Sequence, residues 1–176
     1  MIESYIGVMT VKRTANMLGA LALALADQMK QATEARLGQG GETPAALATL
    51  GHEPGLSVDM LRRILGLTHS GGVRLVDRLA ADGLVEKRHG QDGRTLALHL
   101  TKEGMALRSA VLLDRAKPIE AALQNLPALD LESLSRILEK LLYALCGSEL
   151  QAYAICRLCD DLACENCPVE RACDDA

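Results

Sequence analysis

The sequence contains no phenylalanine, no tryptophan and only 3 tyrosines among its 176 residues. Hydrophobic residues nevertheless make up 49% of the chain, so a core has to be built from leucine, alanine, isoleucine, valine and methionine. Such a composition is typical of packed helices rather than of sheets, which favour aromatic and β-branched side chains. The length predicts about one domain, with room for a terminal appendage.

We also expect neither a targeting signal nor a membrane-spanning segment. The start, MIESYIGVMTVKR, has no basic segment followed by an apolar stretch, so we expect no secretory signal. The most apolar run, residues 17–26, is too short to cross a bilayer. We therefore expect a cytoplasmic protein with no membrane partner. In that reducing compartment, clustered cysteines indicate metal or redox chemistry more often than disulfides.

The net charge of −4 at pH 7 argues at first against a nucleic-acid partner. The charges are unevenly distributed, however: residues 57–102 hold 8 basic and 5 acidic side chains, whereas residues 146–176 hold 2 and 7. The middle of the chain is the basic segment, and the acidity is concentrated at the end. A nucleic-acid contact is expected in the middle and not in the acidic tail.

Long helices are predicted on both sides of the basic segment. Residues 11–37 contain no proline, and the glycines that follow can end a helix. The middle third of this helix is apolar on every face, which favours burial on more than one side, for instance in a dimer interface. A further helix, capped at its start by Thr101 to Gly104 (TKEG), is predicted to run to about Leu126. Pro127 separates it from another helix over residues 128–155, which can break at Gly147.

The basic segment itself predicts two helices joined by a tight turn, preceded by a short helix that Thr43 caps. Ser57 caps the first of the pair, and Gly66 ends it. Thr68 or Ser70 caps the second. The expected buried stripe of the second helix comprises Val73, Val76, Leu79 and Ala80.

After Gly83 the spacing of hydrophobic residues changes from that of a helix to every second residue, as in a β-strand. Leucines alternate with other residues after the polar tip HGQDGR, which predicts a β-hairpin. A helix, a tight turn, a helix and a charged hairpin form a winged helix-turn-helix, so the expected fold class is mainly α with a small β-hairpin wing and long dimerisation helices. The second helix of such a unit can enter a major groove, while the hairpin reaches a minor groove or the phosphates.

Basic and small residues lie where such a unit would meet DNA. The second helix opens with His69, Ser70, Gly71 and Gly72, whose small side chains and backbone N–H groups suit a phosphate or a base edge. Arg74 and Arg78 are one turn apart on the face away from the apolar stripe, and Arg88 and Arg94 flank the hairpin tip.

The block LSVDMLRRILGLTHSGGVRLVDRLAADGLVEKRHGQDGRTLALHLTKEG resembles the DNA-binding core of the MarR family of bacterial regulators. The family pattern pairs a recognition unit, LGL(S/T) followed by VDRL and GLV, with a wing that ends in DGR and is followed by LT and a glycine. Here the matching wing residues are Asp92, Gly93, Arg94, Leu100, Thr101 and Gly104. With the flanking helices, the resemblance extends over about residues 10–146.

The resemblance implies an obligate homodimer, in which the first and last helices interlock, bound to a pseudo-palindromic operator in double-stranded DNA. In that picture Asp92 orients Arg94, which enters the minor groove. The small Gly71 and Gly72 depart from the family and favour close backbone approach over side-chain readout. The full expected set of DNA-binding residues is Thr68, His69, Ser70, Gly71, Arg74, Arg78, Arg88, Asp92 and Arg94.

On this interpretation the chain divides into an N-terminal dimerisation helix (1–42), a winged helix-turn-helix domain (43–104), C-terminal dimerisation helices (105–150) and a cysteine-rich tail (151–176). The predicted function is that of a sequence-specific transcription regulator, a repressor and not an enzyme. Its input is a small ligand, as the family implies, or the metal or redox state of the tail. The alternatives are a dithiol or metal redox protein, and a non-specific DNA-binding or interaction module that uses the winged helix as a scaffold.

The tail carries five of the six cysteines. Cys156, Cys159, Cys164 and Cys167 form C-x2-C-x4-C-x2-C, and two such pairs supply the four thiolates of a structural zinc site or an iron–sulfur cluster. Zinc is the first choice, an iron–sulfur cluster the second, and metal-free thiols the third. We expect this site to lie away from the DNA-binding face, near the dimerisation helices.

The remaining cysteines and the histidines fit no metal-ligand spacing. Cys146 and Cys173 lie outside the motif, and either can be a free thiol or a partner in an intersubunit disulfide. The four histidines are predicted to lie at the surface or at an interface, with His69 and His89 the best placed to contact phosphate. They are His52, His69, His89 and His99.

Overall fold

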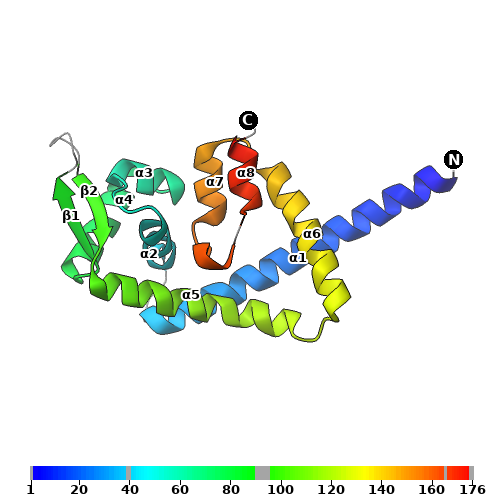
Figure 1. Cartoon of the computed structure of the whole chain (residues 1–176), viewed down its shortest axis with the longest axis horizontal. Helices are drawn as coiled ribbons and strands as arrows, with labels where there is room; N and C mark the ends of the chain where they lie inside the picture. The colour runs from blue at the N-terminus through cyan, green and yellow to red at the C-terminus, as the bar shows by residue number, and fades with distance from the viewer. Residues whose placement is uncertain (1, 39–40, 90–95, 165, 175–176) are drawn as a thin grey trace.

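The computed structural model describes residues 2–38, 41–89, 96–164 and 166–174, with their side chains from Thr10 onward. It is mainly helical, and its strands form a single two-stranded sheet within these ranges (Figure 1). The elements in chain order are α1 (Ile2–Leu37), α2 (Thr43–His52), α3 (Val58–Ile64), α4 (His69–Ala81), β1 (Val85–His89), β2 (Leu96–Leu100), α5 (Lys102–Leu123), α6 (Ala128–Leu145), α7 (Glu149–Cys156), the 3-10 helix η1 (Asp161–Ala163) and α8 (Pro168–Asp174).

The C-terminal part of helix α1 packs against α5. The N-terminal part of α1 projects well beyond the rest of the chain (Figure 1). The helix begins at Ile2 rather than at Val11, and it ends at Leu37, as predicted. Within the single chain its apolar side chains are exposed. They include Val11, Met17, Leu18, Leu21 and Leu23. The burial on several sides that the sequence predicts is therefore not supplied by this chain.

The core of the molecule lies within the winged-helix unit, formed by α2, α3, α4 and the hairpin. Its buried residues come from every one of these elements: Ala45, Ala46, Leu50, Leu61, Ile64, Leu65, Leu75, Val76, Leu79, Val85 and Leu98. Full burial of one leucine side chain stabilises a fold by about 1.5–3 kcal/mol. This shared core therefore fixes the positions of α4 and the wing relative to each other.

Three of the predicted helix caps are confirmed. The hydroxyl of Ser57 accepts from the N–H of Met60 at 3.1 Å, and the hydroxyl of Thr68 accepts from Gly71 at 3.1 Å. The cap predicted at Thr43 is wrong, because α2 begins at this residue and its N-cap is Glu42, which makes no side-chain cap hydrogen bond. Thr43 instead accepts a hydrogen bond from Arg78 Nη2 at 3.1 Å, which ties α2 to α4. The third confirmed cap is Thr101, at the start of α5.

The buried face of α4 differs from the predicted stripe. Gly72, Leu75, Val76 and Leu79 are buried, whereas Val73 is exposed and Ala80 is half-buried. The reason is steric: a Cβ at Gly72 would lie 2.6 Å from Cβ of Arg62 on α3. The two helices meet at this glycine, which turns its neighbour Val73 toward solvent.

The wing is an antiparallel hairpin, as predicted, with Val85 opposite Leu100 and His89 opposite Leu96. The second edge of β2 is also bonded: Gly55 donates its N–H to the carbonyl of Leu98 at 2.8 Å, and Leu98 donates to the carbonyl of Leu56 at 2.9 Å. The wing is therefore held from both sides at its base.

The C-terminal helices fold back across the molecule. The break near Gly147 is confirmed, because α6 ends at Leu145 and Ser148 caps α7. Figure 1 shows α7 and α8 between the winged-helix unit and α6. Helix α8 packs on α6, as connectivity predicts, but α7 packs on α3, so the tail bridges the two parts. Within the described ranges, no helix is both long and apolar enough to cross a membrane.

Candidate functional site: a nucleic-acid interface and a cysteine cluster

The start of α4 presents exposed polar side chains from Thr68, His69 and Ser70. Its backbone donors are less available than the sequence predicts. The N–H of Gly71 is taken by the Thr68 hydroxyl, and the N–H of Gly72 donates to the Thr68 carbonyl at 2.9 Å. Any contact with a phosphate or a base edge at this end of the helix thus depends mainly on the side chains and on the positive end of the helix dipole.

The two glycines of α4 have different roles. Gly72 is buried against Arg62, so its small size serves the close packing of α3 and α4, and the predicted backbone approach to DNA is wrong at this position. Gly71 is half-buried, and a Cβ there would meet the hydroxyl oxygen of Thr68 at 3.1 Å. Because Gly71 has no side chain, the Thr68 hydroxyl can keep its capping position.

The two arginines of α4 lie on its exposed face, as predicted. Arg78 is held toward α2 by its hydrogen bond to Thr43, whereas Arg74 lies one turn closer to the start of the helix. Arg74 therefore shares a helix face with Ser70, one turn earlier, near the end of the helix that would meet a groove.

The wing adds further charge beside α4. Arg88 is exposed on β1 and pairs with Glu86 on the same strand. Lys87 Nζ contacts Asp77 Oδ1 of α4 at 2.6 Å, which links the strand to the helix. Asp92 and Arg94, predicted at the hairpin tip, lie outside the described residues, so their pairing stays a prediction.

The second candidate site is in the tail. Cys156, Cys159, Cys164 and Cys167 line one cavity of about 120 Å³, together with His52, Asp161 and Glu170. The structure therefore brings the four motif cysteines together from the end of α7, the following turns and the start of α8. Two local features explain this: Cys159 donates its N–H to the carbonyl of Cys156 at 2.8 Å, and Asn166 has a φ of 53° between the second pair.

The thiols of this cluster contact one another in pairs, which perturbs their acidity. Hydrogen bonding to Cys159, followed by burial, strongly raises the pKa of Cys156. The same hydrogen bond, aided by the charges of Arg115, His52 and Arg157, outweighs burial and lowers the pKa of Cys159 to about 6. Burial and the neighbouring Cys167 raise the pKa of Cys164 to about 11.

The contacts run as a chain from Cys159 to Cys156, Cys167 and Cys164. In the part of the chain that the structure describes, no three His, Cys, Asp or Glu side chains already converge as ligands of one ion. The cluster is thus a set of reduced thiols gathered around one space, and the metal site predicted from the sequence stays a prediction.

The two cysteines outside the motif also meet. Cys146 Sγ, at the end of α6, lies 3.0 Å from Cys173 Sγ on α8. The sequence left each of them as a free thiol or an intersubunit partner, whereas the structure pairs them within one chain. Neither of them lines the four-cysteine cavity, although Cys173 lines a neighbouring cavity together with Cys156.

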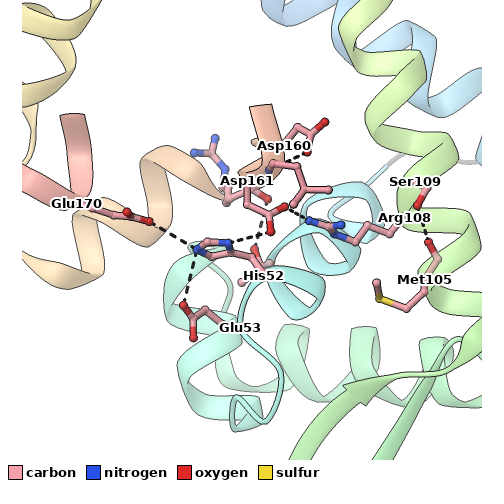
Figure 2. A network of polar contacts seen from close by, with 11 residues as sticks. His52, Glu53, Met105, Arg108, Ser109, Asp160, Asp161 and Glu170 are labelled. Atoms are coloured by element: carbon pink, nitrogen blue, oxygen red, sulfur yellow. Dashed lines mark hydrogen bonds and ion pairs between the residues drawn. The ribbon is translucent and has the colours of Figure 1, made fainter. Parts of the chain in front are cut away.

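A polar network connects the tail to the winged-helix unit (Figure 2). Buried Arg108 of α5 pairs with Asp161 of η1, and Nδ1 of His52, on α2, lies 3.5 Å from the same carboxylate. Burial alone would raise the pKa of Asp161, but the hydrogen bond and charge of Arg108, with a smaller effect of His52, hold it below its ordinary value. His52 Nε2 also faces Glu170 of α8 at 4.0 Å.

The sequence did not identify this network. His52 was assigned only to a surface or interface, and Arg108 and Asp161 were not singled out. One signal was available: Gly51 interrupts a helix rich in alanine and leucine, where glycine is unfavourable. A Cβ at Gly51 would lie 2.2 Å from Cδ of Arg108. The absence of a side chain at Gly51 therefore leaves room for Arg108 to extend toward the tail.

Comparison with known proteins agrees with this architecture. Residues 42–95 match the sequence model of the MarR family. The transcriptional regulator PetP of Rhodobacter capsulatus is 43% identical over 63 residues, which make up 35% of this chain and 38% of PetP. The chain thus matches well under half the length of that curated relative.

Solved structures extend the similarity to the long helices. A MarR family protein from Bacillus stearothermophilus superposes with a TM-score of 0.67 at 23% identity, covering 75% of this chain and 92% of that one. A MarR family protein from Mycobacterium tuberculosis, in complex with p-aminosalicylic acid, gives 0.58 at 25% identity and covers 72% and 96%. The winged-helix unit of this chain is therefore similar to that of the MarR family, and the helices around it share the fold of the solved MarR family structures.

Proposed function

We propose that the protein is a homodimeric, sequence-specific DNA-binding transcription regulator that acts as a repressor. The observation that carries this proposal is the exposed face of α4, where Thr68, His69, Ser70 and Arg74 lie beside a basic wing on a shared buried core. A B-DNA major groove, roughly 12 Å wide, admits one α-helix, and the wing would then reach the neighbouring phosphates or minor groove. The relatives whose function is named are regulators, which supports a role other than catalysis.

Exposed apolar surface supports the dimer. Besides the α1 side chains, α6 exposes Leu129, Ile137, Leu138, Leu141 and Leu145. Such long apolar faces on two helices mark an interaction site rather than an ordinary monomer surface. A second copy of the chain would cover both, and a two-fold axis would place two α4 helices in successive major grooves, about 34 Å apart.

A small ligand is a candidate input for the regulator. A cavity of about 440 Å³ lies between α1, α2, α5 and α7, and its basic lining residues are Lys30, Arg115 and Arg157. The M. tuberculosis relative binds p-aminosalicylic acid, an aromatic carboxylate. We propose that an anionic ligand in this cavity changes the spacing of the two α4 helices and thereby the affinity for DNA.

The test is operator binding by the full chain. Duplexes enriched from a random-sequence pool are compared with random duplexes, and a sequence-specific regulator prefers the enriched ones by roughly 10³-fold or more. Arg74→Ala should weaken binding to the enriched duplex by about 1–3 kcal/mol. Arg171→Ala removes the same charge from an exposed site in the tail and should leave affinity unchanged.

Each outcome bears on one part of the proposal. Equal binding to enriched and random duplexes contradicts sequence-specific recognition and favours the non-specific module. Equal losses for Arg74→Ala and Arg171→Ala contradict the assignment of α4 as the recognition helix. Arg94→Ala tests the wing separately: unchanged affinity for the enriched duplex would show that Arg94 does not enter the minor groove.

A further inference from the structure

We propose that Cys156, Cys159, Cys164 and Cys167 form a four-thiolate zinc site that fastens the tail to α2 and α5. The four side chains line one cavity of about 120 Å³, and no non-motif cysteine lines it. Zinc binds four thiolates in a tetrahedron with Zn–S distances of about 2.3 Å. One ion at the centre of this cavity would therefore complete the site.

The spacing of the thiols favours a single ion over a cluster. Cys156 lies close enough to Cys159 and Cys167, and Cys164 close enough to Cys167, for these thiols to shift one another's pKa, and all four line the same cavity. In a tetrahedral zinc site neighbouring sulfurs are about 3.8 Å apart, so four thiols that line one small cavity surround a space of the size that a single ion needs. An iron–sulfur cluster inserts several irons and sulfides between the thiolates and requires them to stand farther apart.

The surroundings compensate the charge of such a site. Zinc with four thiolates carries a net charge of −2, in a tail that is already acidic. Arg115 and Arg157 line a cavity with Cys159, and Arg108 pairs with Asp161 at the rim of the cluster. The Nε atoms of Arg108 and Arg115 are buried with no hydrogen-bond partner among the described residues, which leaves these N–H donors available to an anionic centre.

The site lies between parts of the chain that are distant in sequence. His52 of α2 and Asp161 and Glu170 of the tail share the lining of the cavity with the cysteines. The Thr49 hydroxyl of α2 also donates to the carbonyl of Arg157, between the first two cysteines, at 3.3 Å. Binding the four sulfurs to one ion would thus order the backbone of the tail around the cysteines. Because α2 contacts this backbone, the ion would also restrict the motion of α2. This inference does not depend on DNA binding.

Metal content provides the first test. The full chain is purified under anaerobic conditions, and zinc, iron and acid-labile sulfide are measured. We expect a colourless protein with about one zinc per chain. Cys159→Ser and Cys167→Ser should each weaken zinc binding by more than about tenfold. The matched control is the double variant Cys146→Ser/Cys173→Ser, which removes the other two thiols and should keep its zinc.

Alkylation of the unmodified chain covers the case in which the serine variants fail to fold. Zinc should protect the four motif cysteines from alkylation, mapped by mass spectrometry, and a strong chelator should expose them. Hydrogen exchange measures the fastening: removal of zinc should speed amide exchange in α2 and α7, and leave the β1–β2 ladder unchanged. Iron with sulfide, absence of metal, or loss of zinc from the control variant would each overturn the site. Unchanged exchange in α2 would overturn the fastening.

Discussion

The winged-helix unit and the cysteine tail are held together in different ways. The unit has a continuous apolar core to which every one of its elements contributes, and its helices α3 and α4 are capped by hydroxyl side chains. Among its described residues, the tail has three short helical pieces, and those that are buried are Cys167, Pro168, Val169 and Ala172. It is attached to the unit by polar contacts around Asp161 and His52, and by Leu150 and Tyr153 of α7, which pack against the edge of the core.

This difference matters for the proposed regulation. Apolar burial is insensitive to the chemical environment, so the surface of α4 and the wing keeps one shape. Contacts between charged groups and thiols respond to metals and oxidants. In the proposed regulator, a stable DNA-binding unit would be joined to a tail whose attachment can change, and the following experiments probe that contrast.

The largest effect is expected in the core of the winged-helix unit. Leu98 is fully buried between the wing and the helices, so Leu98→Ala should lower the free energy of unfolding by about 3 kcal/mol. Leu162→Ala makes the same change at a tail side chain that is 84% exposed, and it should change stability by less than about 0.5 kcal/mol. Urea denaturation followed by circular dichroism measures both. Equal losses would show that the tail shares the core of the unit.

A smaller effect is expected at the attachment of the tail. Asp161→Asn removes the charge that Arg108 and His52 share, and the loss of a charge-assisted hydrogen bond costs about 1.5–3 kcal/mol. Asp160→Asn makes the same change one residue earlier, where the carboxylate only caps η1. Hydrogen exchange in α7 should therefore rise much more for the first variant than for the second. Similar increases would mean that the Arg108–Asp161 pair does not hold the tail.

Gly51, which leaves room for the Arg108 side chain, allows an independent test of the Arg108–Asp161 contact. In Gly51→Ala the new methyl group would meet Arg108 Cδ, and such overpacking costs about 1–3 kcal/mol, reduced here to the extent that the long side chain can shift. We expect faster exchange in the tail with little change in the β1–β2 ladder. Gly51→Ala in an Asp161→Asn background should then add little to the exchange rates of the tail. Fully additive effects would contradict a shared mechanism.

The smallest effect is a pH dependence at the junction of α1 and α5. Asp114 has its pKa lowered to about 2 by hydrogen bonds from Arg36 of α1 and from Lys117. Because the folded pKa lies below the ordinary value of 3.8, this contribution to stability is complete above about pH 4 and is lost as the pH falls toward 2. Urea denaturation of metal-free protein between pH 5 and pH 2.5 should show a steeper loss for the wild type than for Asp114→Asn. Parallel curves would contradict this role.

Much of the fold follows from local sequence patterns. The hydrophobic period changes from helical to two after Gly83, and a hairpin forms there. Ser57, Thr68 and Thr101 have hydroxyls at the right distance from a backbone N–H, so they cap α3, α4 and α5. The spacing of the four cysteines likewise predicted that they would meet. Such features depend on residues a few positions apart, which the order of the chain already places together.

The errors arise where distant segments compete for the same space. Val73 was assigned to the buried stripe because its spacing fits a helix, but contact between Gly72 and Arg62 turns it outward. Thr43 was assigned as a cap from its residue type, although the loop before α2 places Glu42 at that position. His52 gave no sign of its position beside Asp161, which is far away in the sequence.

The sequence by itself determined the kind of molecule: a helical chain with a capped helix-turn-helix, a basic wing and a four-cysteine motif. Each of these is a local pattern, and backbone geometry and hydrophobic periodicity are enough to specify it. Tertiary structure alone decided which face of α4 is buried, that Cys146 meets Cys173, and that the tail lies against α2 rather than beside α6 alone. These outcomes depend on how helices pack, and packing depends on shape complementarity between residues that no short sequence window contains.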